Sequence, residues 1–148
     1  MIYPIYIYGS GVLRKECEEI DESYPELPKL IEDMFATMYA TDGVGLAAPQ
    51  IGKDIRLFVV DATPFEEDDP TAKGFKKAFI NPEIYEVSEE EVLLNEGCLS
   101  VPGIHEDVYR PESIRINYLD ENFVEHDEEL TGWPARIVQH EYDHLDGV

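Results

Sequence analysis

The chain has 148 residues, of which 33 are acidic and 11 are basic, so its formal net charge at pH 7 is −22. This length suits one domain that buries an apolar core without disulfides or a structural metal. The strongly negative surface argues against nonspecific binding to nucleic acid or to anionic membranes, because it repels phosphate groups.

The cysteine count and the hydropathy of the chain indicate a compartment. Two cysteines, Cys17 and Cys98, are too few for the disulfide framework of a secreted domain. No stretch is long and apolar enough to predict a membrane span, and residues 1–6 lack the basic start and cleavage site of a signal peptide. We therefore expect a soluble protein of a reducing cytoplasm with no membrane partner.

The region before the first helix has little regular pattern. Residues 5–13 predict an extended arm, and an acidic run over residues 16–22 follows it. Because Cys17 lies in that polar run, we expect it to be a bystander thiol.

The first helix is predicted over residues 27–41. Its apolar residues recur at three- and four-residue steps, as on one helix face: Leu30, Ile31, Met34, Phe35, Met38 and Tyr39. Lys29, Glu32 and Asp33 are expected to face solvent. Gly43 follows the helix and is suited to the left-handed conformation that ends many helices.

Residues 43–52 (GVGLAAPQIG) combine three glycines, a proline and small apolar side chains. This composition predicts no regular element, but it lets a backbone lie close to another chain or a ligand. A connecting loop is normally polar, whereas this one is apolar with a single amide, Gln50. Such a segment is typical of the wall of a binding site.

The rest of the chain predicts strands and a second helix. Residues 55–61 have the unbroken apolar character of a buried strand, and residues 62–77 predict a long, polar, mobile loop. Short strands are predicted over residues 78–80, 84–87, 92–94 and 104–109, with Pro82 allowed only at an edge or a break. A hairpin is predicted from residues 113–119, a turn at 120–122 and residues 123–130. A last helix over residues 133–145 completes an α+β fold, with antiparallel sheets around this late helix and one amphipathic helix near the N-terminus.

The last helix carries the sequence H-E-x-x-H. His140 and His144 lie four residues apart on one helix face, a spacing at which two imidazoles reach one metal ion. Glu141, beside them, can hold a water near the metal and carry its proton. The motif therefore predicts a catalytic metal site.

A catalytic site of this kind needs a third protein ligand, with a further position open for water. The candidates are Cys98, His105, His126 and the carboxylates. Cys98 is favoured because it lies between a glycine and an apolar residue at the end of a strand, where a thiolate would be a strong ligand. His105 and His126 are expected at the surface.

Three stretches together resemble one known family. They are residues 43–50 (GVGLAAPQ), residues 96–100 (EGCLS) and residues 139–144 (QHEYDH), in this order and at suitable spacing. The chain closely resembles peptide deformylases over nearly its whole length. These hydrolases remove the formyl group from the N-terminal formylmethionine of newly made polypeptides and release formate.

The resemblance implies roles for residues at the metal. Cys98, His140 and His144 match ligands of one divalent metal, typically Fe(II), which Zn, Ni or Co can replace. Glu141 matches the catalytic acid and base.

The resemblance also implies roles around the substrate. Gln50 and the backbone N–H of Leu99 match the pair that stabilises the oxyanion. Val44 and Gly45 match the wall along which the peptide lies, and Val44 and Ile137 are expected in the pocket for the methionine side chain.

The resemblance further implies a setting for the protein. We expect a bacterial, cytoplasmic monomer that acts on N-formylmethionyl nascent peptides, with the ribosome near the exit tunnel as a partner and no direct binding of nucleic acid. Residues 1–148 are expected to form one catalytic domain without the C-terminal tail that usually follows His144-Leu145-Asp146-Gly147 in this family. From charge and family-like position, we also expect Arg110 to pair with Glu96.

Three other functions remain open from the sequence. A metallopeptidase can use H-E-x-x-H, but Gln50 and residues 96–100 would then have no role. An inactive homologue could bind metal only to stabilise its fold, which normally takes four protein ligands. Cys98 could instead act as a nucleophile with a histidine as its base.

Overall fold

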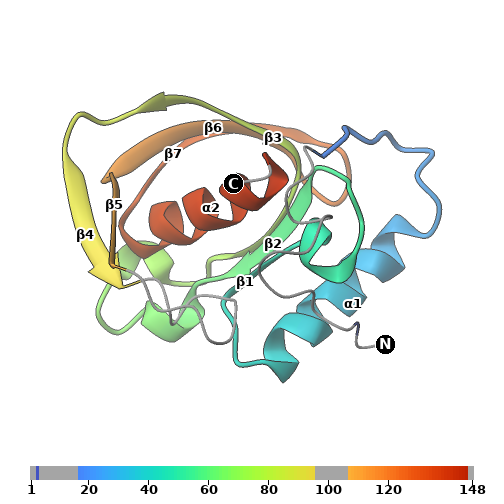
Figure 1. Cartoon of the computed structure of the whole chain (residues 1–148), viewed down its shortest axis with the longest axis horizontal. Coiled ribbons are helices and arrows are strands. Elements are labelled where there is room, and N and C mark those ends of the chain that lie inside the picture. Colours follow the sequence, from blue (N-terminus) through green and yellow to red (C-terminus); the bar gives the residue numbers. More distant parts are fainter. Residues whose placement is uncertain (1–2, 4–16, 96–106, 147–148) are drawn as a thin grey trace.

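A computed structural model of the chain describes residue 3, residues 17–95 and residues 107–146. One antiparallel sheet has the strand order β1-β2-β3-β6-β7, and β4 and β5 form a separate hairpin (Figure 1). The helices are α1 (Leu27–Ala40) and α2 (Gly132–Leu145), and the strands are β1 (Gly45–Ala47), β2 (Leu57–Asp61), β3 (Lys76–Val87), β4 (Glu91–Asn95), β5 (Asp107–Pro111), β6 (Ser113–Leu119) and β7 (Glu125–Thr131). The predicted α+β class is confirmed.

Strand β2 is shared by two apolar cores on opposite faces of the sheet. Leu57 and Val59 pack with the buried side chains of α1, whereas Phe58 and Val60 pack with those of α2. Successive side chains of a strand point to opposite faces, so a strand covered on both faces needs apolar residues throughout. This explains the unbroken apolar sequence that predicted a strand over residues 55–61.

Helix α1 matches its predicted bounds to within one residue, but two of its side chains were assigned to the wrong face. Asp33, expected in solvent, is only 4% exposed, and it pairs with Lys29 at 3.4 Å. Tyr39, expected in the core, is 45% exposed because its hydroxyl reaches across to donate a hydrogen bond to Asp61 Oδ2 at 2.5 Å. Asp33 is paired within the helix and Tyr39 is bonded to β2, so polar contacts of both kinds changed the boundary of the apolar face.

The end of α1 uses a different residue from the predicted one. Asp42, and not Gly43, takes the left-handed conformation, with φ of 57°. The N–H of Asp42 donates to the Tyr39 carbonyl and that of Gly43 to the Met38 carbonyl, at 3.1 and 3.0 Å. This pair of bonds is the Schellman arrangement, and aspartate is among the few residues with a side chain that tolerate it.

The prediction of no regular element over residues 43–52 is wrong. Gly45–Ala47 pairs with β2 as the short edge strand β1, and Ala48–Ile51 forms a 3-10 helix. Both helices contact β1, and residues 44–51, most of which have small side chains, are buried between the two cores.

The segment predicted as a mobile polar loop over residues 62–77 has structure of its own. Two 3-10 turns, Thr63–Phe65 and Pro70–Ala72, lie in it, and β3 begins already at Lys76. The ring of Phe65 stacks on that of Trp133 at 4.2 Å between centroids. This segment is therefore attached to the start of α2.

The strands differ from their predictions mainly in continuity. Strand β3 is one strand of 12 residues, and Pro82 lies at a register shift between Ile80 and Glu83, next to Asn81 with φ of 50°. The proline is thus accommodated by an irregularity within β3 and not by a strand end.

Strand β6 matches its prediction in full, whereas β7 starts two residues later than predicted. β4 and β5 confirm the remaining strands, although residues 104–106 lie outside the described part of the chain.

Helix α2 begins one residue before its predicted start and is capped from elsewhere in the chain. Asp69 Oδ2 accepts a hydrogen bond from the Trp133 N–H at 2.8 Å, while Thr131 makes no side-chain cap. Gly132 has φ of 61°, and a Cβ on it would lie 2.3 Å from Asp69 Oδ2. The start of α2 therefore depends on both glycine and the 62–75 segment.

The last turn of α2 contacts Cys17. The Cys17 N–H donates to the Leu145 carbonyl at 2.9 Å, and its side chain lies in the core on the α2 side of the sheet. This thiol is buried although it lies in a polar run, and its role as a bystander stays a prediction. In the described residues, no helix has the length and apolar character required to cross a membrane.

Candidate active site

His140 and His144 lie one turn apart on α2, as the motif predicts. Their ring centroids are 5.2 Å apart and their planes are inclined at 82°. The Nε2 atom of His144 is buried and has no hydrogen-bond partner among the described residues. A buried ring nitrogen of this kind fits a metal ligand, because leaving it unsatisfied would otherwise cost free energy.

The protonation state of His144 also suits a ligand. Burial lowers the pKa of His144 to about 4, and electrostatic interactions with His140 and Arg110 act in the same direction. The imidazole is therefore neutral at pH 7, which is the form that binds a metal.

The described residues alone do not complete a metal site. Residues 17–95 and 107–146 contain no group of three His, Cys, Asp or Glu side chains that could hold a metal. Cys98, the predicted third ligand, and Leu99, the predicted oxyanion donor, lie outside the described residues, as does His105. The structure thus brings together two of the three predicted ligands.

Glu141 is fully buried on α2 and faces β1. Its carboxylate and Cγ lie against the backbone of Gly45, because a Cβ built on that glycine would meet them at 2.7 to 3.0 Å. The predicted acid and base is therefore held between the helix and the edge strand, and not in open solvent.

Gln50 has an amide whose orientation is fixed by one hydrogen bond. Its Oε1 accepts from the Ala47 N–H at 2.9 Å, and the whole side chain is buried. Its Nε2, a donor, is buried without a hydrogen-bond partner in the described part of the chain. This is the arrangement expected of a group that donates to a substrate oxygen.

The two residues predicted for the methionine pocket share one apolar cluster. Val44, immediately before β1, and Ile137, on α2, are both buried in the core on the α2 side of the sheet. Their place in the methionine pocket stays a prediction.

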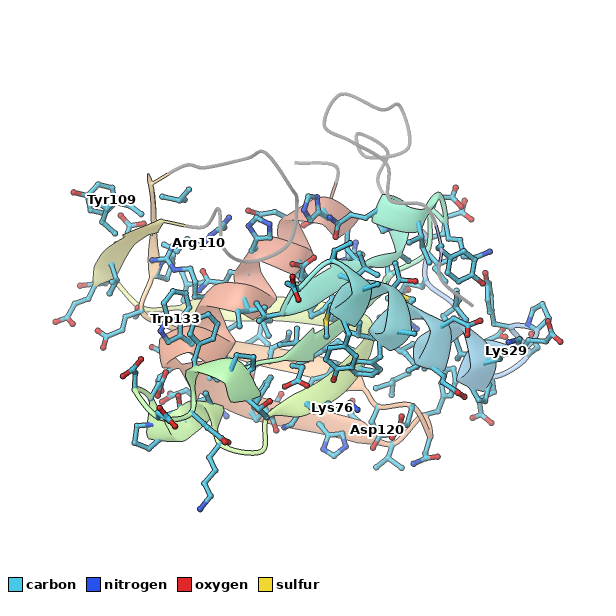
Figure 2. All side chains as sticks on the ribbon, turned by 90° about the horizontal axis from the view of Figure 1, so that it is seen from below. Lys29, Lys76, Tyr109, Arg110, Asp120 and Trp133 are labelled. Atoms are coloured by element: carbon cyan, nitrogen blue, oxygen red, sulfur yellow. The ribbon has the colours of Figure 1, made fainter. Side chains whose placement is uncertain are left out.

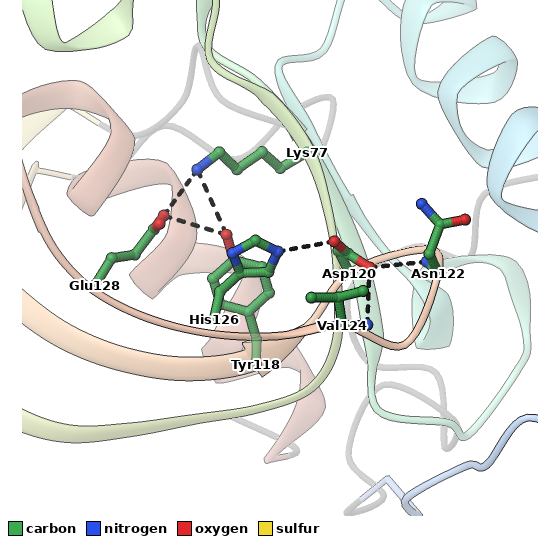
Figure 3. Close-up of polar contacts among 7 residues, drawn as sticks. All are labelled: Lys77, Tyr118, Asp120, Asn122, Val124, His126 and Glu128. Atoms are coloured by element: carbon green, nitrogen blue, oxygen red, sulfur yellow. Dashed lines mark hydrogen bonds and ion pairs between the residues drawn. The ribbon is translucent and has the colours of Figure 1, made fainter.

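His126 belongs to a separate polar network on β6 and β7. Its Nε2 contacts Asp120 Oδ2 at 2.8 Å and its ring stacks on Tyr118 (Figure 3). Its side chain is half-exposed, as expected. A ring nitrogen that already contacts a carboxylate on another element does not complete the site on α2.

Four polar contacts, which the sequence did not predict, attach the β4–β5 hairpin to α2. The Arg136 guanidinium donates to the carbonyls of Val92 and Val108. Gln139 Nε2 donates to the Pro111 carbonyl at 3.0 Å. The fourth contact is an ion pair between Arg110 and Asp143, 2.7 Å apart.

These contacts fix the hairpin against the helix that bears the histidines, and Figure 2 shows Arg110 beside α2. Residues 136, 139 and 143 recur at three and four residues along α2, so their shared face was the signal that could have revealed them. Glu96, the partner expected for Arg110, lies outside the described residues.

Comparison with known proteins places the chain in a family. Residues 2–148 match the family model described as polypeptide deformylase. A peptide deformylase of Flavobacterium psychrophilum is 52% identical over 155 residues, covering all of this chain and 80% of the relative, and one of Christiangramia forsetii is 47% identical, covering all of this chain and 79% of the relative. The crystal structure of peptide deformylase from Thermotoga maritima matches with a TM-score of 0.88 at 41% identity, covering all of this chain and 94% of that one. The chain therefore belongs to the polypeptide deformylase family, metal-dependent hydrolases that remove the N-formyl group from nascent polypeptides.

Proposed function

We propose that this chain hydrolyses the formyl group of N-terminal formylmethionine with His140, His144 and Cys98 as ligands of one divalent metal. The observation that carries the assignment is the buried Nε2 of a neutral His144, which has no hydrogen-bond partner in the described residues and lies one turn from His140. A site of two imidazoles and one thiolate suits Fe(II), and Zn, Ni or Co can occupy it.

The metal, when bound, supplies a Lewis acid that lowers the pKa of a water and polarises the formyl carbonyl. Glu141 takes the proton of that water on its carboxylate and passes it to the amide nitrogen of methionine as the C–N bond breaks. Addition of one water across this bond gives formate and a free N-terminus.

Gln50 stabilises the charge that develops during this reaction. As the water oxygen adds, the formyl oxygen becomes negative, and Gln50 Nε2 donates a hydrogen bond to it. The Leu99 N–H is the second donor in this proposal. Removal of one such donor typically lowers kcat by about 10²–10³-fold, because the interaction is made mainly in the transition state.

The substrate peptide lies along β1. In the described sheet β1 pairs only with β2, so its other edge is open to an added strand. Backbone pairing beside Val44 and Gly45 would hold peptides of any later sequence. The methionine side chain would contact the apolar cluster that contains Val44 and Ile137.

The proposal includes the setting of the enzyme. Residues 1–148 form one catalytic domain, which works as a monomer in the bacterial cytoplasm on nascent peptides near the ribosomal exit tunnel. The net charge of −22 supports selective contact with the peptide over binding of nucleic acid or membranes.

The test is formate release from a formyl-Met peptide by protein loaded with iron in the absence of air. The wild type should release formate, whereas Glu141→Ala should retain its metal and lose at least about 10³-fold in kcat. The same peptide without the formyl group is the control, because only a peptidase would cleave it. Folded, metal-loaded wild type that releases no formate would overturn the proposal.

A further inference from the structure

Gly45 has no room for a side chain because of Glu141. A Cβ built on Gly45 would lie 2.7 Å from Glu141 Oε2, 2.9 Å from Cγ and 3.0 Å from Cδ. Contacts shorter than 3.0 Å essentially never occur at real Cβ atoms. The described glycines with positive φ are Gly52, Gly74 and Gly132, so Gly45 is needed for space and not for its backbone conformation.

The strand cannot easily move away from this contact. Gly45 pairs with Val60 of β2, and the Val44 carbonyl accepts from the Asp61 N–H at 2.9 Å. β2 in turn is buried at all five positions and pairs with β3. A shift of β1 would therefore disturb the centre of the sheet.

The helix is equally constrained on the other side of the contact. Asp69 caps its first turn, and Arg136 and Gln139 bind it to the β4–β5 hairpin. Glu141 itself is fully buried, so its carboxylate cannot swing into solvent. A side chain at position 45 would consequently be accommodated mainly by displacement of the Glu141 carboxylate.

We propose that Gly45 is a positioning residue for Glu141, because the bare backbone of β1 is the surface against which the carboxylate is set beside the histidines. This inference rests on the proposed function, since it assigns to Gly45 a role beyond lining the peptide site. Misplacement of a reacting group by about 1 Å can cost on the order of 10²-fold in rate. The absence of a side chain at position 45 therefore sets the position of the carboxylate that transfers the proton, in addition to leaving room for the substrate.

The first experiment is a double-mutant cycle in kinetics. Gly45→Ala should lower kcat by about 10²-fold with KM nearly unchanged. In the Glu141→Asp background, where the shorter side chain leaves room for a methyl group, the same substitution should change kcat by less than about threefold. If Gly45 acted only through the substrate, KM would rise and the loss would be equal in both backgrounds, which would overturn the inference.

Gly43→Ala is the matched control in the same segment. A Cβ on Gly43 would make ordinary contacts of 3.5 to 3.6 Å, and its backbone is not left-handed. This variant should keep the melting temperature of the metal-free protein within error, which is the readout that Gly43→Ala controls. A loss as large as that of Gly45→Ala would show that the segment is sensitive to any methyl group, and would overturn the inference.

The second experiment does not depend on activity. In metal-free protein, Gly45→Ala should lower the melting temperature by about 5 °C through overpacking. In the Glu141→Ala background the loss should disappear, because the methyl group then finds free space. Equal losses in both backgrounds would contradict the contact with Glu141. If the wild type released no formate but this cycle held, the proposed function would fail while the packing role of Gly45 stood.

Discussion

The two helices have the same length, 14 residues each, but they are held in different ways. Helix α1 contacts the sheet through apolar side chains such as Leu30, Met34 and Met38. Helix α2 buries Arg136, Gln139 and Glu141 among its apolar residues. Helix α1 also buries Asp33 and Thr37, whose partners include Lys29 and the Asp33 carbonyl of the same helix. The buried Arg136 and Gln139 of α2 instead donate to carbonyls of the β4–β5 hairpin.

The partners of α2 come from distant parts of the chain. Asp69 lies 64 residues before Trp133, and Val108 and Pro111 each lie 28 residues before the side chains that contact them. Helix α2 is thereby fixed at its start, along one side and against β1. We infer that changes to α1 should alter stability alone, whereas changes to the partners of α2 should also alter the site.

The largest expected effect on stability lies in α1. Met34 is fully buried, so Met34→Ala should lower the free energy of unfolding by about 3 kcal/mol through lost burial and a cavity. The kcat per folded molecule should not change. Urea unfolding and formate release measure the two quantities, with the exposed Glu32→Ala as control. A fall in kcat while the protein is fully folded would show that α1 also affects the site, which would contradict the inferred difference between the two helices.

The next effect concerns the hairpin contact of α2. Arg136→Met keeps the apolar stem but removes the donors to the Val92 and Val108 carbonyls, which should cost about 2 kcal/mol because two hydrogen bonds from a charged group are lost. Unlike Met34→Ala, it should also weaken metal binding, since Cys98 lies in the chain between β4 and β5.

A chelator competition titration would measure this change in metal affinity. Arg115→Met is the matched control, because Arg115 is an exposed arginine on β6 whose ion pairs with Asp127 and Glu129 lie away from α2. Unchanged affinity in Arg136→Met would show that the hairpin does not position the third ligand.

A smaller effect is expected at the start of α2. Asp69→Ala removes the acceptor of the Trp133 N–H and should cost about 1 kcal/mol, whereas the exposed neighbour Asp68→Ala should be neutral. Burial alone would raise the pKa of Asp69, but hydrogen bonds from the Thr71 side chain and from the Trp133 and Thr71 N–H groups outweigh it and lower the pKa.

The lowered pKa gives this effect a pH dependence. Because the pKa in the folded state lies below that in the unfolded state, the carboxylate stabilises the fold above pH ~4. The contribution is lost as the pH falls through the folded-state pKa. The stability difference between wild type and Asp69→Asn should therefore shrink on acidification, as read by urea unfolding at several pH values. A difference that grew at low pH would contradict this sign.

The elements predicted correctly are those whose signal is local. Helix α1 and strand β6 each show their period within a few residues, and β2 is apolar because both its faces are covered. The 62–75 segment was missed because its order comes from Phe65 on Trp133 and from Asp69 at the helix start. Neither contact leaves a pattern in the local sequence.

The candidate site also has one part with a local signal in the sequence and one part that depends on a long-range contact. The spacing of His140, Glu141 and His144 is a local helical pattern, so it predicted a metal site before any fold was known. The contact of Gly45 with Glu141 joins an edge strand to the last helix and depends on the missing volume of one Cβ. The sequence shows the glycine, but only the packing shows what its small size accommodates.

The smallest predicted effect is a stabilisation at the end of α1. Asp42 adopts φ of 57°, where a side chain is strained and glycine is not, so Asp42→Gly should raise the free energy of unfolding by about 0.5 kcal/mol. Asp42→Asn, which tolerates the same conformation, should be nearly neutral, and neither variant should change kcat. At the start of α2 no such gain exists, because Gly132 already has positive φ and faces Asp69. Destabilisation by Asp42→Gly in thermal unfolding would mean that the aspartate side chain makes a compensating contact, and α1 would then share the dependence on polar groups that distinguishes α2.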